Sequence, residues 1–101
     1  MTDETRAILS SHLLRLLSNR EYPKTICPSE VARAVTSLEL ETMGVNSWRD
    51  LMPSVRELAW DLRTGSSPNL EVLQGGQVVD EGVALEDIRG PIRLRLGQGA
   101  K

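Results

Sequence analysis

The residues that would point most directly to enzymatic chemistry are the only cysteine and the only histidine of the chain. Cys27 directly precedes a helical pattern, and the positive end of a helix dipole stabilises a thiolate. Catalysis or redox sensing would also need a neighbouring base or cation and a resolving thiol. No second cysteine exists, and His12 lies at the edge of an apolar helical face, where a histidine is usually a packing residue. We therefore predict that the chain is not an enzyme, and chemistry based on Cys27 is a distant third alternative.

The stretch ICPSEV is instead typical of a helix N-terminus. Cys27 occupies the N-cap, and Pro28 occupies the first helical position, where a missing N–H costs nothing. Glu30 can accept a hydrogen bond from the backbone N–H of Cys27, as in half of a capping box. Ile26 and Val31 have the spacing of a hydrophobic staple. The sequence thus predicts that Cys27 begins a helix.

Cofactor and metal chemistry has little support in the sequence. One cysteine and one histidine exclude an intrachain disulfide and make a zinc site of the Cys/His kind untenable. The acidic residues Glu81, Glu86 and Asp87 lack the spacing of a calcium loop, and the glycines follow no strand-to-helix phosphate motif. We predict no metal and no cofactor.

Charges interrupt every apolar run and the first residues are acidic, so we expect no membrane span, no signal peptide and a reducing cytoplasm.

The composition and the apolar spacing predict one small domain that begins with helices. The chain has 101 residues, of which 40% are hydrophobic and 26% charged, and we expect one domain over residues 1–96 and a disordered tail over 97–101. Apolar residues at helical spacing predict helices over residues 3–19, 28–38 and 48–64. The second helix has one apolar stripe of Val31, Ala32, Val35 and Leu38, which we expect to be buried. Pro53 should either kink the third helix or mark its true start. Residues 25–27 are expected to be extended, and ELETMGVN to form a loop.

After TGSSPN the period changes from helical to alternating. LEVLQ and QVVD, joined by Gly75 and Gly76, predict a hairpin because two glycines supply the positive φ angles of a tight turn. IRLRL alternates strictly and predicts a half-buried closing strand. Three helices, a hairpin and a closing strand describe an α+β fold of the winged helix-turn-helix kind. The alternative is another small α+β arrangement.

Three blocks of the chain resemble one protein family. KTICPSEVARAV, WRDLMPSVRELAW and RGPIRLRL are similar to the landmark segments of a small, mainly bacterial family known as a domain of unknown function, DUF3253. The resemblance covers about residues 6–96. It implies a winged-helix-like architecture and adds no activity, because the family has no established catalytic residues. The longer SLELETMGVN between the second and third helices departs from the family pattern.

A winged helix that reads DNA places its third helix in the major groove and grips phosphate with its wing. Here the third-helix face opposite the core contains Asp50, Glu57 and Asp61. The segment between Thr64 and Ile88 contains no Lys or Arg but does contain five acids, Glu71, Asp80, Glu81, Glu86 and Asp87. Carboxylates at these places would repel phosphate, so the usual mode of DNA reading is disfavoured.

Binding of nucleic acid would then depend on basic residues elsewhere. The candidates are Lys24, Arg49, Arg56, Arg63, Arg89, Arg93 and Arg95. They would form one patch if the closing strand lies beside the third helix. In the alternative, Arg93 and Arg95 form the solvated side of the strand, and the helical arginines pair with Glu57 and Asp61.

The few aromatic residues limit the remaining possibilities. Trp48 begins the apolar stripe of the third helix and is predicted in the core. Trp60 lies off that stripe, so it is either covered by the hairpin or exposed as a partner contact. Stacking of single-stranded RNA bases is disfavoured, because the chain has no Phe. We predict a non-catalytic module that binds nucleic acid, and the alternative is a protein-interaction or homodimerisation domain that uses the acidic wing and the Trp60 region.

Overall fold

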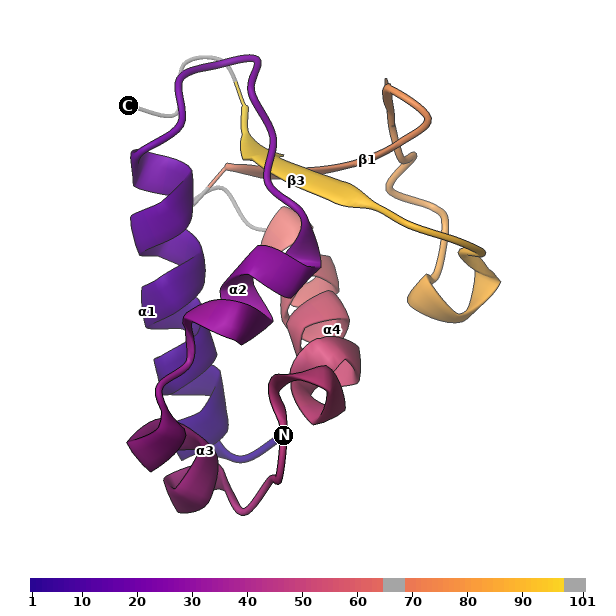
Figure 1. The fold of residues 1–101 in the computed structure, drawn as a ribbon. Coiled ribbons are helices and arrows are strands. Elements are labelled where there is room, and N and C mark those ends of the chain that lie inside the picture. Colours follow the sequence, from indigo (N-terminus) through magenta and orange to yellow (C-terminus); the bar gives the residue numbers. More distant parts are fainter. Residues whose placement is uncertain (65–68, 98–101) are drawn as a thin grey trace.

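Helices and a small antiparallel sheet make up the computed structural model, which describes residues 1–64 and 69–97. Within these residues the α-helices are α1 (Asp3–Ser18), α2 (Pro28–Ala34), α3 (Ser37–Met43) and α4 (Met52–Arg63), and the strands are β1 (Leu70–Gln74), β2 (Gln77–Val78) and β3 (Arg93–Leu96) (Figure 1). Two short 3-10 helices, η1 (Trp48–Leu51) and η2 (Leu85–Asp87), complete the order. The predicted α+β class is confirmed, and the arrangement is compatible with a winged-helix-like fold.

The first helix forms where its apolar spacing predicts. Thr2 caps it, since its hydroxyl accepts a hydrogen bond from the backbone N–H of Thr5 at 3.1 Å. Leu9, Leu13 and Leu17 recur every four residues, and all three are buried. The helix ends at Ser18, one residue before the predicted limit.

The second helix is shorter than predicted, and a further helix follows it. The helix predicted over residues 28–38 ends at Ala34, because Val35 is extended with a ψ angle of 130°. ELETMGVN, predicted as a loop, contains most of α3. Since the helical register restarts, Leu38 does not continue the apolar stripe of α2, and its side chain is 76% exposed. The predictions of three helices and of a buried Leu38 were therefore wrong.

Local hydrogen bonds explain why α3 forms. The Thr36 hydroxyl accepts from the backbone N–H of Glu39 at 3.1 Å, and the Glu39 carboxylate accepts from the backbone N–H of Thr36 at 2.9 Å. This is a complete capping box. Gly44 ends the helix in the left-handed conformation at a φ of 73°, which a glycine adopts without strain.

Glu39 also connects α3 to α1. The Nε2 atom of His12 lies 2.8 Å from a Glu39 carboxylate oxygen, and the Arg15 guanidinium lies 3.0 Å from the other ring nitrogen. The Thr36 backbone N–H and the His12 side chain hold the pKa of the Glu39 carboxyl below its ordinary value of 4.5. The carboxylate therefore contributes stability above that pH and loses it as the pH falls through the lowered pKa.

Glu39→Gln tests this contribution, because glutamine keeps the hydrogen-bond acceptor and removes the charge. We expect the variant to have a free energy of unfolding lower by up to about 1 kcal/mol at neutral pH. The difference should close as the pH falls through the lowered pKa of Glu39, where the wild-type carboxyl becomes protonated. Urea denaturation followed by circular dichroism at several pH values measures both quantities. A difference that does not change with pH would contradict the assignment.

The third predicted helix divides at its proline. Residues Trp48–Leu51 form η1, and α4 begins at Met52, so Pro53 stands in the first turn of the α-helix. Of the two roles predicted for Pro53, it marks the true start of the helix. Val55, Leu58 and Ala59 are buried as their spacing predicts.

The sheet has the order β2–β1–β3, and both pairings are antiparallel. Gly75 and Gly76 form the predicted hairpin turn with φ angles of 59° and 81°. The predicted extended segment 25–27 joins the sheet through Ile26, whose backbone N–H and carbonyl each bond Leu94 at 2.8 Å. Figure 1 shows the sheet lying across one end of α2 and α4, while the chain between β1 and β3 projects to one side.

One hydrophobic core lies between the helices and the inner face of the sheet. Val72 of β1 faces Leu94 of β3 in register, and both side chains are buried. The other fully enclosed large side chains come from every long element, and they include Leu13, Leu58 and Ile92. Gly97, predicted in the disordered tail, donates its backbone N–H to the carbonyl of Asn69 at 2.8 Å. The loop predicted at TGSSPN and the rest of the tail lie largely outside the described residues.

Candidate nucleic-acid interface

Cys27 begins α2 as predicted. Its backbone N–H donates to a Glu30 carboxylate oxygen at 2.7 Å, and the Ser29 hydroxyl donates to its sulfur at 3.1 Å. Both ring nitrogens of His12 are engaged with Glu39 and Arg15, so the histidine is part of a different network. Among residues 1–64 and 69–97 no three His, Cys, Asp or Glu side chains gather into a possible metal site. Cys27 therefore has the contacts of a helix cap.

Trp60 and Arg63 hold the turn that follows β2. Arg63 donates three hydrogen bonds to backbone carbonyls, at 3.0 Å to Asp80, 2.9 Å to Glu81 and 2.6 Å to Val83. The Trp60 indole N–H also donates to the Val83 carbonyl, at 3.0 Å, and the Arg63 guanidinium lies 4.6 Å from the centroid of its ring. Of the two predicted environments for Trp60, the structure has the covered one, and the cover is residues 80–83.

Three other candidate arginines are Arg95, Arg56 and Arg89. Arg95 pairs with Glu71 at 2.7 Å and lies 4.7 Å from the centroid of the Tyr22 ring. Arg56 is half-buried and reaches the Gly90 carbonyl at 3.5 Å, while Arg89 is exposed in the loop before β3. Arg63, Arg95 and Arg56 thus contact three different parts of the fold, which are residues 80–83, Glu71 with Tyr22, and Gly90.

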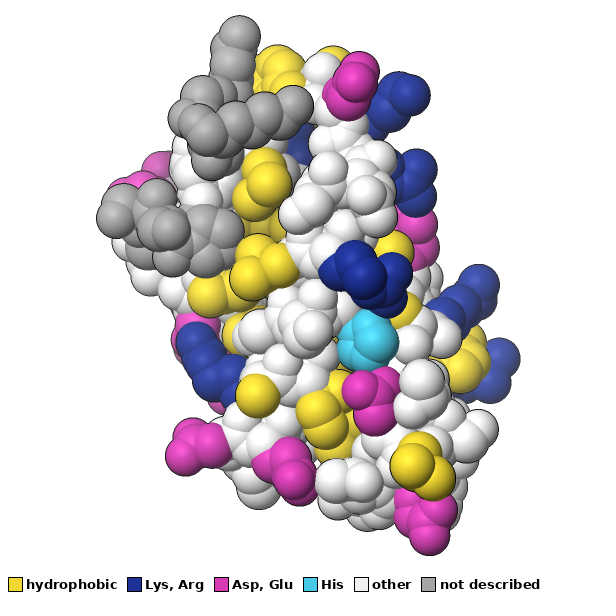
Figure 2. Space-filling view, turned by 90° about the vertical axis from the view of Figure 1, so that its left-hand side faces the viewer, with side chains coloured by type: hydrophobic (Ala, Val, Ile, Leu, Met, Phe, Trp, Pro, Cys, Tyr) yellow, Lys and Arg dark blue, Asp and Glu magenta, His cyan; other side chains and the backbone are white. Residues whose placement is uncertain are grey.

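The remaining candidates, Lys24, Arg49 and Arg93, lie along one side of the molecule with two further arginines. We call this side the basic edge and define it as Arg20, Lys24, Arg33, Arg49 and Arg93, all exposed. Arg93 donates to the hydroxyl and the carbonyl of Thr25, at 2.9 and 3.2 Å, and Arg20 pairs with Glu30 of α2 at 2.7 Å. In Figure 2 most of the dark-blue side chains lie along the right-hand edge.

Arg33 and Arg49 share one aromatic ring, Trp48. Arg33 comes from α2 and Arg49 from η1, and each guanidinium lies 4.6 Å from the centroid of the Trp48 ring. Trp48 is half-buried and packs against the edge of the core, so the prediction of a core tryptophan was only partly correct. We call this group the Arg33–Trp48–Arg49 cluster. Arg33 could not be predicted from local spacing, because its contact with Trp48 joins α2 to η1, and α3 lies between them in the chain.

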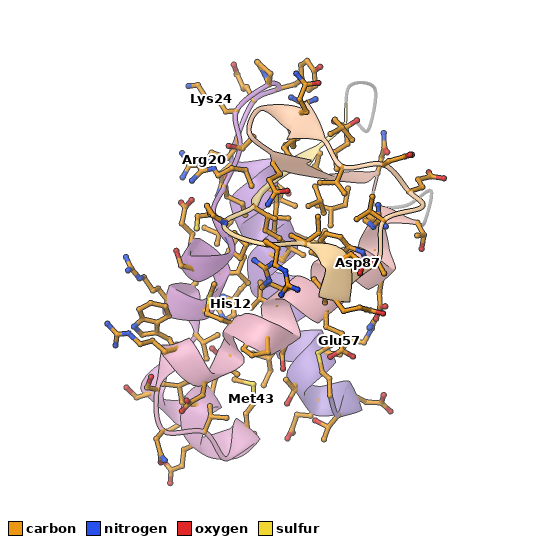
Figure 3. The ribbon with its side chains drawn as sticks, turned by 90° about the vertical axis from the view of Figure 1, so that its right-hand side faces the viewer. His12, Arg20, Lys24, Met43, Glu57 and Asp87 are labelled. Carbon is orange, nitrogen blue, oxygen red and sulfur yellow. The ribbon has the colours of Figure 1, made fainter. Side chains whose placement is uncertain are left out.

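A set of exposed carboxylates lies on α4 and on the segment after β2. We call this the acidic face, and it consists of the exposed side chains of α4 and of the segment after β2: Glu57, Asp61, Asp80, Glu81, Glu86 and Asp87. Figure 3 shows Glu57 and Asp87 to the right of Arg20 and Lys24. Asp61 pairs with Arg6 of α1 at 2.8 Å, and Glu57 pairs with no arginine in the described part of the chain. The predicted pairing of the helical arginines with these two acids was therefore wrong.

Comparisons with known proteins identify a family. The model of a family described as "Protein of unknown function (DUF3253)" matches residues 6–97. No curated protein matches the chain. In the described ranges no helix is long and apolar enough to cross a membrane.

Proposed function

This chain belongs to the DUF3253 family of proteins of unknown function, and from its surface we propose that it is a non-catalytic, winged-helix-like module of the cytoplasm that binds nucleic acid through the basic edge. The observation that supports this proposal most is the set of exposed cations on the basic edge, of which only Arg20 has a carboxylate partner in the described residues. Five cations lie along one side, although the net charge of the chain is −2.

The contacts of the basic edge leave its charges available to a polyanion. Only Arg20 has a carboxylate partner in the described residues, and that pair with Glu30 is exposed and therefore weak. Arg93 bonds only neutral oxygens of Thr25, so its charge is not neutralised. Each Lys or Arg that neutralises a phosphate releases counterions, and this supplies most of the sequence-independent affinity for nucleic acid.

The proposed orientation differs from that of a DNA-reading winged helix. The acidic face includes the exposed side of α4 and the segment after β2, which correspond to the parts of a DNA-reading winged helix that contact the major groove and the backbone. These parts should therefore point away from the ligand, while the segment before α2, α2 itself and β3 face it. Contacts to phosphate position a protein without reading bases, so we expect little sequence preference.

The acidic face supports a second candidate function. Six exposed carboxylates on adjacent segments would suit a basic protein partner or a second copy of the chain. The Trp60 part of this alternative has less support, because residues 80–83 cover that side chain. Light scattering detects a homodimer directly.

A charge-matched pair of variants tests the proposed interface. Lys24→Gln/Arg93→Gln removes two charges from the basic edge. Arg6→Gln/Arg89→Gln removes two charges from positions outside it, the half-buried Arg6 and the exposed Arg89. Fluorescence anisotropy with labelled single-stranded and duplex oligonucleotides over a salt series measures affinity and its salt dependence. We expect the edge variant to reduce the slope of log K against log salt by about 1 to 2 relative to wild type. The control should retain the wild-type slope.

Two outcomes would contradict the proposal. Absence of binding to either form of nucleic acid at low salt would exclude the basic edge as a nucleic-acid surface. Equal losses in the two double variants would show that net charge, and not the position of the edge, determines the binding.

A further inference from the structure

The Arg33–Trp48–Arg49 cluster differs from the other arginine–aromatic contacts in its exposure and charge. Arg63 on Trp60 is committed to three backbone carbonyls, and Arg95 on Tyr22 is neutralised by Glu71. Arg33 and Arg49 are both exposed, and neither pairs with a carboxylate in the described ranges. The cluster therefore presents two cationic guanidinium groups on a surface aromatic ring.

The ring that orders these groups is itself held in place. Trp48 packs against the core, and it opens η1, whose N-cap Ser47 accepts a hydrogen bond from the backbone N–H of Arg49 at 3.1 Å. A guanidinium that rests on an indole ring loses less side-chain freedom on binding than an unsupported one. The cluster is thus a prearranged contact on the basic edge.

Guanidinium and indole groups are both flat and can stack on a nucleobase, which a simple cation cannot do. Unpaired bases stack on aromatic rings and on the planes of arginine side chains, while the same guanidinium can donate to phosphate. A base can stack on either guanidinium here or replace it over the indole. Bases within a duplex are already stacked on one another and cannot make this contact.

The shape of the charged surface also favours an unpaired strand. A duplex presents phosphates on two strands and is bound by a broad positive surface or by parts that straddle a groove. Here the cations come from β3, the segment before α2, α2 and η1, while α4 and the segment after β2 contribute the acidic face. A single strand can follow one line of cations with its bases turned toward an aromatic group.

The lack of Phe argues against base stacking from sequence alone, but this cluster supplies a stacking surface made of Trp and Arg instead. We infer that the Arg33–Trp48–Arg49 cluster is a base-stacking contact and that the basic edge prefers single-stranded nucleic acid to duplex. This inference rests on the proposed function, since the strand must first bind the basic edge. The ligand is identified by its unpaired bases and its phosphates, which single-stranded DNA and RNA have in common.

The test uses a double variant that keeps every charge. Arg33→Lys/Arg49→Lys preserves the net charge of the chain but removes both planar groups. Anisotropy is measured with oligothymidylate, oligouridylate, an abasic strand of equal length and a duplex. We expect wild type to bind the first two about 5- to 100-fold more tightly than the abasic strand. The lysine variant should lose most of that advantage and bind the abasic strand and the duplex as wild type does. Trp48→Leu, checked for folding by circular dichroism, should show the same selective loss.

Separate results overturn the inference and the proposed function. If the abasic strand or the duplex binds wild type as tightly as the unpaired strands, the inference is wrong, although the basic edge still binds nucleic acid. If the lysine variant binds all four ligands as wild type does, the arginine planes make no stacking contact. If wild type binds none of them, both proposals are wrong.

Discussion

Replacing Leu58 with alanine is expected to lower the free energy of unfolding by about 2–5 kcal/mol. Leu58 is 0% exposed and lies on the side of α4 that packs against α2 and β1. Truncation removes apolar contacts and leaves a cavity that the surrounding helices can only partly fill. Alanine itself favours the helix, so the loss measures packing and not helix propensity. Because a small domain has a total of about 5–15 kcal/mol, the variant should be close to the limit of stability.

The same substitution at Leu38 is the matched control. Leu38 also lies in a helix but is 76% exposed, so we expect Leu38→Ala to change the free energy of unfolding by less than about 0.5 kcal/mol. Urea denaturation followed by far-ultraviolet circular dichroism compares the two midpoints. Equal shifts in the two variants would show that α4 does not form the centre of the core.

Replacing Arg63 with methionine is expected to lower the free energy of unfolding by about 2–3 kcal/mol, because a hydrogen bond from a charged donor contributes more stability than one from a neutral donor. Arg63 donates to the carbonyls of Asp80, Glu81 and Val83 and lies over the Trp60 ring. Methionine keeps the aliphatic contact with the indole but makes none of these hydrogen bonds. The turn after β2 should therefore lose order even when the helices remain folded.

Amide hydrogen exchange locates this second effect. The backbone N–H of Val83 donates to the Asp80 carbonyl at 3.0 Å inside the turn, so its protection reports on the turn directly. We expect that protection to fall in Arg63→Met, while the amides of α1 change only by the loss of global stability. Arg89→Met removes an exposed charge from the same segment and should leave Val83 protected. Unchanged protection in Arg63→Met would contradict the role assigned to Arg63.

The elements that could be predicted are those that depend on residues close to one another in the chain. The cap at Cys27, the Leu repeat of α1 and the Gly75–Gly76 turn depend on residues within one or two turns of one another, and all three formed as predicted. The error at α3 was also local. Thr36 and Glu39 have the spacing of a capping box. The apolar spacing of α2 extends through Leu38, however, and so it hid the start of α3.

The basic edge could not be predicted in the same way, because it depends on contacts between distant segments. Arg93 joins the basic edge through Thr25, which is 68 residues away in the chain. Arg33 gains its aromatic partner only when α2 packs beside η1. The exposed acids of α4 were predictable, since they follow from the side of the helix opposite its apolar stripe.

Because the basic edge and the acidic face are formed by different segments of the fold, we expect the domain to carry an electric dipole. In the field of a polyanion such a molecule rotates before it touches, so that more of its diffusional collisions begin with the cationic side in front. Orientation of this kind raises the association rate without adding a single contact, and added salt weakens it as the screening length shortens. A chain that is negative overall can in this way be captured quickly by a negative ligand.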